Sequence, residues 1–432
     1  MEPNQNIWNM YGLKDNPFST DPLTLYGTEL PIKDTFVGRQ KEIQRIKRDI
    51  YSNKSSRILV YGDVGVGKTS FVNYVKYAAV SDGYFTPFGE MGIQYDWSPE
   101  EFMFNTISTV YTTIERTDGI KKKFSPSLFS KLSVIFGTDR GYSSGGGMSA
   151  FGFGANAETG KAYGVPRLNA ATLKLMFQDV LDELLRCGYK GVIIHYNNLE
   201  LIQDKGENQL RRILNGIRDF LQVSGAHFVF VSDTKLYELF AQLPRVEDIF
   251  KVPVLISPFD MGQVKEIINR RISLLKIDKV TPILPYDDES LSILFKLYRG
   301  NLRGILRSLD CAVSEIVAST PLRISPDRLK DALSKSARRR YLSHFPKENS
   351  NTIKILMCIL EKRETTPKIL AEHFKMLPQN VSACLSELRE VGAIRISREE
   401  GRSRYYVPSQ EAFWLLFEPA EGLDGQQHIS DW

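Results

Sequence analysis

The chain has 432 residues, too many for one ordinary hydrophobic core, so two or three domains are expected. Hydrophobic residues make up 42% of it and charged residues 25%, as in a soluble globular protein. No stretch approaches the roughly 18 consecutive apolar residues of a membrane span, and the start "MEPNQNIWNM" lacks the basic and apolar regions of a signal peptide. Membrane and secreted classes are therefore not expected, and a cytoplasmic location is predicted. The four cysteines lie far apart without a CxxC pair, which predicts reduced core thiols.

The net charge of +5 is unevenly distributed along the chain. Between Asp331 and Gln410 there are 15 Lys and Arg against 9 Asp and Glu, a local excess of +6 that leaves −1 for the remainder. An electrostatic footprint for a polyanion is therefore expected in the C-terminal segment.

Residues 1–35 are polar and irregular, and form a predicted N-terminal extension. From Phe36 to about Leu255, short β-branched or aromatic runs alternate with helical patterns. This order predicts an α/β fold, a parallel sheet with helices on both faces. The Gly-rich stretch 141–164 is either a flexible loop or a hairpin insertion. The predicted strands are "RILVYG" (57–62), "GVIIHY" (191–196), "HFVFVS" (227–232) and "KVPVLI" (251–256).

The stretch "GDVGVGKTS" fits the phosphate-loop pattern GxxxxGK[ST] between a predicted strand and a predicted helix. Backbone amides of such a loop surround the β-phosphate, and the helix N-terminus adds its positive end. Lys68 is expected on the β- and γ-phosphate oxygens, and the Thr69 hydroxyl on Mg²⁺. ATP and Mg²⁺ are therefore the predicted cofactors. The predicted nucleotide-binding loop comprises Gly62, Asp63, Val64, Gly65, Val66, Gly67, Lys68, Thr69 and Ser70.

The strand in "GVIIHYNNLEL" ends where a nucleotide hydrolase usually places its acidic residues. The positions at this end carry His195, Tyr196, Asn197 and Asn198. The sequence therefore raises the question of whether the protein hydrolyses the nucleotide that it is expected to bind.

The pattern from Pro258 to about Arg340 is helical throughout and predicts an all-helical lid. A linker at 343–351 precedes a unit with the order of a winged helix. The helix "LPQNVSACLSELREVG" keeps Val381, Leu385 and Leu388 on one face. The predicted boundaries are 1–35 for the extension, 36–257 for the core, 258–342 for the lid, 352–417 for the winged helix-turn-helix and 418–432 for an acidic tail.

The other face of that helix and the following strand pair offer groups suited to double-stranded DNA. Gln and Asn side chains pair with adenine edges or phosphates, and arginines of a wing contact phosphates or the minor groove. The run 338–340, three arginines, either extends this footprint or is a solvated helix end. The candidate DNA-binding residues are Gln379, Asn380, Ser382, Ser386, Arg389, Arg395, Arg398, Arg402 and Arg404.

Two further stretches carry a family resemblance. "FVGRQKEIQRI" (36–46) and "YRGNLRGILRSLD" (298–310) resemble the entry segment and the sensor-2 helix of AAA+ ATPases of the origin-recognition and STAND type. The start "YGLKDNPFSTDPLTLY" (11–26) is also similar to AAA+ proteins linked to transposition and secretion. The C-terminal unit resembles the winged helix-turn-helix of MarR- or ArsR-like regulators, which ends many AAA+ proteins of the origin-recognition type.

The resemblance implies three further roles, one of them with two candidate residues. Arg303 would contact the γ-phosphate from the lid. Asp233 or Ser232 would be the polar sensor-1, and Arg245 the arginine finger.

At the acid-bearing strand of this family, two alignments of the sequence are open. In the favoured one, Asn197 stands for the magnesium-side Asp, Asn198 for the water-activating Glu, and Glu200 for the following acid. The other places His195 at the Asp position. An amide at position 198 cannot take a proton from water, which removes a general base worth about 10²–10⁴-fold in rate, unless Glu200 replaces it.

These features predict an ATP-binding AAA+ nucleotide switch that hydrolyses ATP slowly, binds DNA through its winged helix, and assembles with itself or a partner. Two alternatives stay open. One is a STAND-like signalling or defence ATPase whose winged helix contacts a protein effector. The other is a DNA-stimulated ATPase that regulates replication or transposition.

Overall fold

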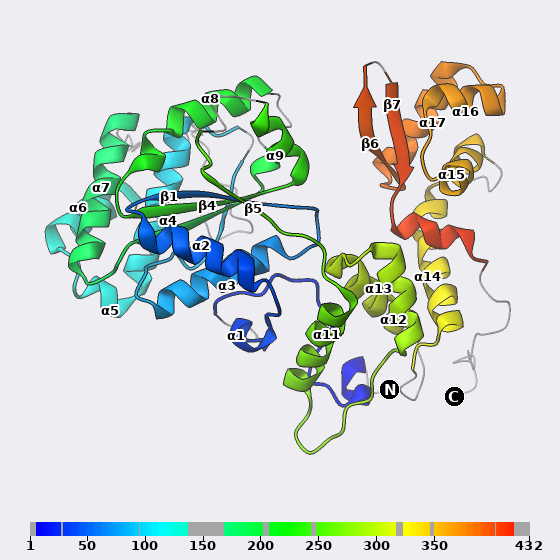
Figure 1. Cartoon of the computed structure of the whole chain (residues 1–432), viewed down its shortest axis with the longest axis horizontal. Coiled ribbons are helices and arrows are strands. Elements are labelled where there is room, and N and C mark those ends of the chain that lie inside the picture. Colours follow the sequence, from blue (N-terminus) through cyan, green and yellow to red (C-terminus); the bar gives the residue numbers. More distant parts are fainter. Residues whose placement is uncertain are drawn as a thin grey trace, which may run out of the picture. The chain divides into compact units, whose positions relative to one another are not determined.

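The computed structural model describes residues 6–26, 29–94, 96–136, 168–201, 207–242, 248–316, 323–345, 350–401 and 403–418. The chain divides into two compact units, Pro22–Ser257 and the combination of Met1–Asp21 with Pro258–Trp432 (Figure 1). Within the described ranges, no helix has the length and apolar character to cross a membrane. The Gly-rich stretch 141–164, Arg245, Arg402 and the tail after Glu418 lie outside the described residues.

A five-stranded parallel sheet in the order β2-β3-β4-β1-β5 organises the first unit. The four predicted strands are confirmed. A fifth strand, β2, was not predicted from the sequence because it has two residues. The strands are β1 (Ser56–Tyr61), β2 (Met91–Gly92), β3 (Val192–Asn197), β4 (Ala226–Ser232) and β5 (Val252–Leu255).

Helices cover both faces of the sheet (Figure 1), so the predicted α/β class is confirmed. The two faces of the sheet pack against different helices, as alternate residues of β1 show. Ile58 and Val60 pack with α2 and α3, whereas Leu59 packs in the larger cluster with α4 and α7. β3 and β4 are buried along their whole length, as expected of central parallel strands. The helices of this unit are α1 (Ile32–Thr35), α2 (Gln40–Ser52), α3 (Lys68–Ser81), α4 (Pro99–Arg116), α5 (Asp118–Lys121), α6 (Pro126–Phe136), α7 (Ala170–Arg186), α8 (Glu207–Ile217), η4 (Phe220–Gln222) and α9 (Thr234–Ala241).

The predicted extension 1–35 is divided between the two units. Its first part contains a 3₁₀ helix, η1 (Ile7–Tyr11), and packs into the second unit. The Lys14 amide donates to the Leu275 carbonyl oxygen at 2.7 Å, and the buried Arg271 guanidinium donates to the Ser19 carbonyl oxygen at 2.6 Å. These non-local contacts give the segment an ordered structure that its turn-rich sequence did not predict. Its buried side chains are Trp8, Tyr11, Leu13 and Phe18.

The rest of the second unit is helical until a C-terminal strand pair. The turn between α12 and α13 needs glycine, since a Cβ on Gly300 would lie 2.0 Å from the Phe259 carbonyl oxygen. The helices here are α11 (Met261–Leu275), α12 (Asp288–Tyr298), α13 (Leu302–Glu315), α14 (Pro326–Tyr341) and η5 (Leu342–His344).

The residues after 350 have the element order and pairing of a winged helix. Thr366 caps α16, with its hydroxyl accepting from the Ile369 amide, and Pro367 occupies the first turn. β6 and β7 pair antiparallel, and Thr365 forms an additional bridge to Tyr406. The elements are α15 (Asn351–Lys362), α16 (Pro367–Phe374), α17 (Pro378–Glu390), β6 (Ile394–Glu400), β7 (Ser403–Pro408) and η6 (Glu411–Leu416).

Candidate nucleotide site and nucleic-acid interface

The predicted phosphate loop joins the carboxyl end of β1 to the start of α3. Gly65 and Gly67 both have a φ of 88°, a left-handed conformation that favours glycine. Gly62 approaches β5 so closely that a Cβ would lie 2.4 Å from the Ile256 carbonyl oxygen. Val66 is fully buried and anchors the loop in the core. The loop therefore has the tight backbone that lets amide groups surround a phosphate at a helix N-terminus.

Lys68 and Thr69 open α3 directly after the loop. The Lys68 ammonium donates to the carbonyl oxygens of Gly62 at 2.7 Å and Asp63 at 2.9 Å. It is thereby held against the loop, where a phosphate would be bound.

Asn197, the last residue of β3, lies beside Thr69. Both its amide oxygen and its amide nitrogen are 3.4 Å from the Thr69 hydroxyl oxygen. Of the two residues that the alternative alignments assign to the magnesium side, Asn197 is the one that contacts Thr69. His195 lies deeper in the same strand, and burial holds its pKa well below the usual value, so its imidazole is neutral.

The donors near the loop suit Mg²⁺, because a hydroxyl and an amide oxygen are the hard ligands that this cation accepts. Among the described residues, no group of three or more His, Cys, Asp or Glu side chains forms a metal site. Thr69 and Asn197 are the residues that would hold a Mg²⁺ ion bound together with nucleotide phosphates.

Asn198 and Glu200 follow β3 in a turn. Asn198 is exposed and has a φ of 60°, a left-handed conformation that Asn tolerates better than most residues. Glu200 is half-buried. The backbone conformation alone is thus a structural reason for Asn at position 198, beside any effect on hydrolysis.

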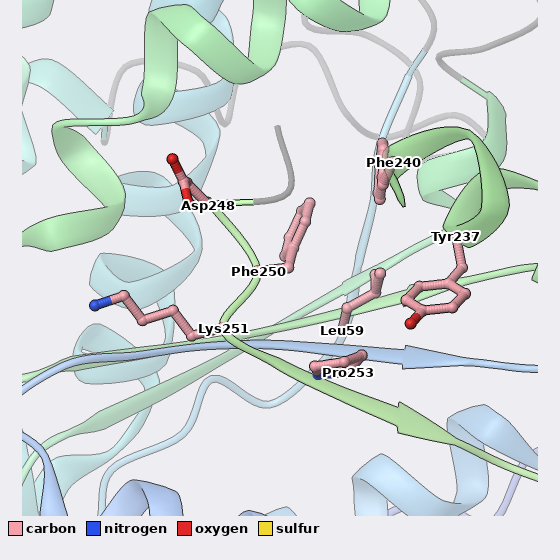
Figure 2. Close-up of a pocket in the computed structure, with 7 residues that line it drawn as sticks. All are labelled: Leu59, Tyr237, Phe240, Asp248, Phe250, Lys251 and Pro253. Carbon is pink, nitrogen blue, oxygen red and sulfur yellow. The ribbon is translucent and has the colours of Figure 1, made fainter. Parts of the chain in front are cut away.

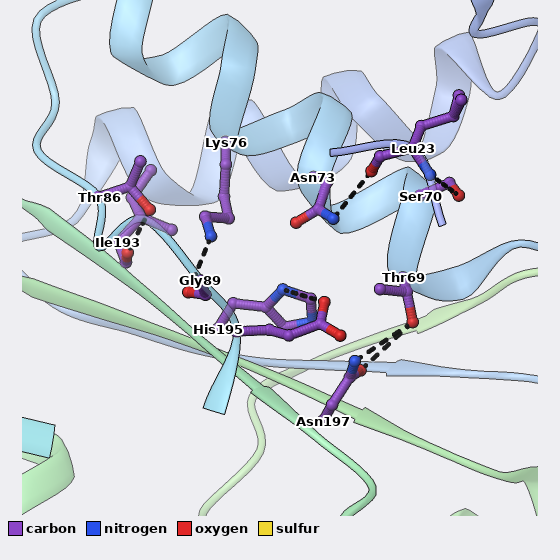
Figure 3. A network of polar contacts seen from close by, with 11 residues as sticks. Leu23, Thr69, Ser70, Asn73, Lys76, Thr86, Gly89, Ile193, His195 and Asn197 are labelled. Carbon is purple, nitrogen blue, oxygen red and sulfur yellow. Dashed lines mark hydrogen bonds and ion pairs between the residues drawn. The ribbon is translucent and has the colours of Figure 1, made fainter. Parts of the chain in front are cut away.

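Three contacts to the loop were not predicted from the sequence. The Arg39 guanidinium donates to the Val66 carbonyl oxygen at 3.3 Å, and the Thr234 hydroxyl donates to the Asp63 carboxylate at 3.4 Å. The Ser70 hydroxyl accepts from the Leu23 amide at 3.1 Å (Figure 3). Arg39 lies within the "FVGR" stretch, which was a usable signal. The other two contacts join segments that are far apart in the sequence, so no local sequence pattern predicts them.

The predicted sensor residues have different surroundings. Ser232 ends β4 in register with Tyr61, so it lies at the edge from which the phosphate loop leaves. The Asp233 carboxylate caps α9 by accepting from the Leu236 amide at 2.8 Å. Arg303 is exposed on α13, in the second unit. The arginine-finger prediction, Arg245, falls outside the described residues.

A cavity of about 340 Å³ lies on the sheet face opposite α3. It is lined mainly by apolar side chains, with Leu59 and Pro253 on the strands and Tyr237 and Phe240 on α9 (Figure 2). It contains none of the phosphate-loop residues and is separate from the candidate nucleotide site.

The predicted DNA-facing side of α17 is exposed. Val381, Leu385 and Leu388 are buried on its other side, as their spacing predicted. An exposed apolar residue, Leu377, precedes the helix and is 68% exposed. The exposed polar residues of this helix are Gln379, Asn380, Ser382, Ser386 and Arg389.

The wing is less basic than its arginines alone suggested. Arg398 forms ion pairs of 3.0 Å with Glu364 and Glu400, and it lies 4.1 Å from the centre of the Tyr405 ring. Arg404 pairs with Glu399 at 2.9 Å. These pairs are exposed, and such pairs are typically worth about 0–1 kcal/mol. The arginines can therefore exchange these carboxylates for phosphates at small cost.

Arg395 is exposed on β6. The fourth predicted wing arginine, Arg402, lies outside the described residues.

No protein-family model matches the chain. An uncharacterized HTH-type transcriptional regulator of Methanocaldococcus jannaschii is 23% identical over 409 residues, which cover 92% of this chain and 91% of the relative.

Solved structures similar to this chain include the Aeropyrum pernix ORC1 protein in complex with DNA (15% identity, TM-score 0.45, 90% of this chain and 94% of that chain). The Aeropyrum pernix ORC2 protein in its ADPNP–ADP complexes has 14% identity and a TM-score of 0.48 (93% and 95%). A Walker-type ATPase of Pyrococcus abyssi has 14% identity and a TM-score of 0.47 (93% and 100%). The α/β fold is given by the strand order of the sheet, in which the phosphate loop follows β1.

Proposed function

We propose that the protein is an ATP-binding switch whose C-terminal winged helix binds double-stranded DNA. The observation that carries this proposal is the phosphate loop, with Gly65 and Gly67 in left-handed conformations and Lys68 and Thr69 at the start of α3. This arrangement serves phosphate binding and needs no other explanation in the fold. Mg²⁺ would accompany the nucleotide at Thr69.

Slow hydrolysis is part of the proposal. Asn197 ends β3 beside Thr69, so β3 presents an amide where a carboxylate is usual. An amide oxygen still accepts a hydrogen bond from a metal-bound water, but the next amide, Asn198, cannot take a proton from an attacking water. Nucleotide binding should therefore persist while turnover is slow. A bound nucleotide that is not quickly hydrolysed suits a switch.

Support for DNA binding comes from α17 and the wing. α17 exposes several polar side chains on one face, and the strand pair after it carries Arg395, Arg398 and Arg404. The segment around them has a charge excess of +6. The similarity to an HTH-type transcriptional regulator points in the same direction. Assembly with itself or with a partner remains part of the proposed switch.

The nucleotide proposal is tested with Lys68→Ala. We expect this variant to lose ATP binding in titration calorimetry, because the only side-chain ammonium of the loop motif is removed. Exposed Lys296→Ala, on α12, is the control and should bind ATP as the wild type does. Micromolar ATP binding by Lys68→Ala would place the nucleotide elsewhere.

A protein effector is the second candidate partner of the winged helix. Two observations favour it: the exposed apolar residues Leu377 and Ile369, at 68% and 44%, and the carboxylates that neutralise wing arginines. DNA binding measured at several salt concentrations separates the candidates, because phosphate contacts make DNA affinity fall steeply with salt. Absent or salt-independent DNA binding would favour the effector.

A further inference from the structure

A polar cluster, buried except for one half-buried carboxylate, lies beside β3 on the side covered by α3 (Figure 3). Its members are Lys76 on α3, Glu90 just before β2, and His195 and Asn197 on β3. Gly92 pairs with Asn197 in the sheet, which sets Glu90 opposite His195. The His195 Nδ1 atom lies 3.8 Å from a Glu90 carboxylate oxygen.

Lys76 fixes the backbone at this point. Its side chain is 1% exposed, and its ammonium donates to the Gly89 carbonyl oxygen at 3.3 Å. Burial lowers the pKa of Lys76 to about 8, and the charge of Glu90 opposes this change. The backbone at Gly89, next to Glu90, is therefore held in position by a charged group within the core.

Such charges are a costly way to fill this space. Removing an ammonium or a carboxylate from water is unfavourable, and apolar residues of equal volume are often as stable as a buried ion pair. Burial also raises the pKa of Glu90, while Asn197 and Lys76 lower it. Packing alone therefore does not account for the buried ammonium of Lys76, which has the half-buried Glu90 carboxylate as its nearby opposite charge.

The polar cluster extends to the phosphate loop. Asn197 is close enough to hydrogen-bond with Glu90, and its amide lies 3.4 Å from the Thr69 hydroxyl. The Glu90 side chain keeps 35% exposure, so its carboxylate is not sealed in the core. Both amide atoms of Asn197 lie 3.4 Å from the Thr69 hydroxyl oxygen, so a carboxylate that accepted from the amide nitrogen would leave the amide oxygen for a cation.

We propose that Glu90, the residue before β2, supplies the carboxylate that β3 lacks, and that it positions Asn197 toward the cation bound with the nucleotide. This inference rests on the proposed nucleotide binding. Glu90 is a positioning residue here: it sets which atom of Asn197 faces the cation and adds negative charge behind it. Outer-sphere partners of this kind typically change metal affinity by about 10–100-fold when they are removed.

The test uses the full chain, a non-hydrolysable ATP analogue, and Mn²⁺ as the metal probe, followed by electron paramagnetic resonance. Glu90→Gln should bind Mn²⁺ about 10–100-fold more weakly in the presence of the analogue. Its affinity for the analogue in EDTA should equal that of the wild type. The control Glu100→Gln removes an exposed carboxylate from the first turn of α4 and should leave both affinities unchanged. Wild-type Mn²⁺ affinity in Glu90→Gln would overturn the proposal.

A second variant guards against damage to the fold. In Glu90→Gln/Asn197→Asp the carboxylate moves to β3, and most of the missing Mn²⁺ affinity should return. If Glu90→Gln loses metal-free binding as well, the double variant decides: recovered Mn²⁺ binding supports the proposal, and analogue binding without recovered Mn²⁺ binding overturns it. If the wild type binds neither analogue nor Mn²⁺, the proposed nucleotide function itself is wrong.

Discussion

The two asparagines after β3 differ in what their amides lose relative to carboxylates. Asn197 still offers an oxygen beside Thr69, so its contribution to a cation is weakened but not abolished. Asn198 has no group that takes up a proton, and its exposed, left-handed backbone is one that Asn adopts readily. We therefore expect position 198 to limit the chemical step of ATP hydrolysis, and we expect nucleotide binding not to be limited at this site.

Asn198→Glu should raise ATP turnover if a missing base limits hydrolysis. The gain is bounded by the roughly 10²–10⁴-fold that a general base supplies, and it is reduced because Glu is less stable than Asn in a left-handed conformation, by about 1–2 kcal/mol at most. ATP affinity should stay unchanged, since no contact of the phosphate loop is altered. Phosphate release under single-turnover conditions measures the effect.

The matched control is Asn198→Gln, which has the same length as Glu and no carboxylate. It should hydrolyse ATP no faster than the wild type. If the wild type already turns over at about 1 per second or more and Glu200→Gln abolishes this activity, then Glu200 is the base and slow hydrolysis is wrong.

At the scale of elements, β4 carries a histidine whose burial disfavours the charged imidazole. His227 on β4 is 2% exposed, and its Nδ1 atom lies 3.0 Å from the Ser56 hydroxyl on β1. Burial lowers the pKa of His227 to about 4 from an ordinary 6.5. Between these values the unfolded chain binds a proton that the folded chain does not, so stability falls as the pH drops from 6.5 toward 4.

Replacing His227 should flatten this dependence. For His227→Gln, the free energy of unfolding should vary less between pH 6.5 and 4, with the difference from wild type reaching at most ~3 kcal/mol across the window. Urea unfolding followed by circular dichroism at several pH values measures it. His373→Gln, an exposed position on α16, is the control and should keep the wild-type dependence. An unchanged pH dependence in His227→Gln would show that His227 is protonated in the folded protein.

A second quantitative prediction at this scale concerns DNA binding by the wing, the strand pair β6 and β7. Arg395→Gln/Arg404→Gln should weaken DNA binding for any sequence, because both substitutions remove a positive charge that can neutralise a phosphate. The slope of log affinity against log salt should become shallower by up to about 0.9 for each phosphate that the variant no longer neutralises. Arg270→Gln, which removes a half-buried arginine from α11, should leave the slope unchanged. A slope equal to that of wild type in the wing variant would assign the winged helix to protein contacts.

Elements with local signals were predictable, and those made by distant contacts were not. β1, β3 and β4 are runs of β-branched and aromatic residues, and the phosphate loop has fixed residues at fixed spacing. β2 has two residues, and the relation of Glu90 to Asn197 exists only through strand pairing. The N-terminal segment reads as turns because its order depends on α11, about 250 positions away in the sequence. Local pattern carries no information on such pairings.

At the scale of the whole molecule, the phosphate loop and the winged helix belong to different units, Pro22–Ser257 and the unit that contains Pro258–Trp432. A nucleotide that contacted the first unit alone would shift no equilibrium between arrangements of the two, because only differential binding does so. Arg303, exposed on α13, is the residue of the second unit for which the family resemblance implies a γ-phosphate contact. It is therefore the expected link between nucleotide state and DNA binding.

Arg303→Ala tests this link. Since only ATP carries the γ-phosphate, the variant should lose ATP affinity while ADP affinity changes little, so that the ratio of the two dissociation constants approaches one. Any difference in DNA affinity between the ATP and ADP states should shrink with it, because the coupling of two ligands is reciprocal. Lys296→Ala, on α12, removes a positive charge from the same unit. It should keep the wild-type ratio of the ATP and ADP dissociation constants and the wild-type difference in DNA affinity between the two nucleotide states. Equal losses of ATP and ADP affinity in Arg303→Ala would make this arginine an ordinary surface residue and leave the two units uncoupled through it.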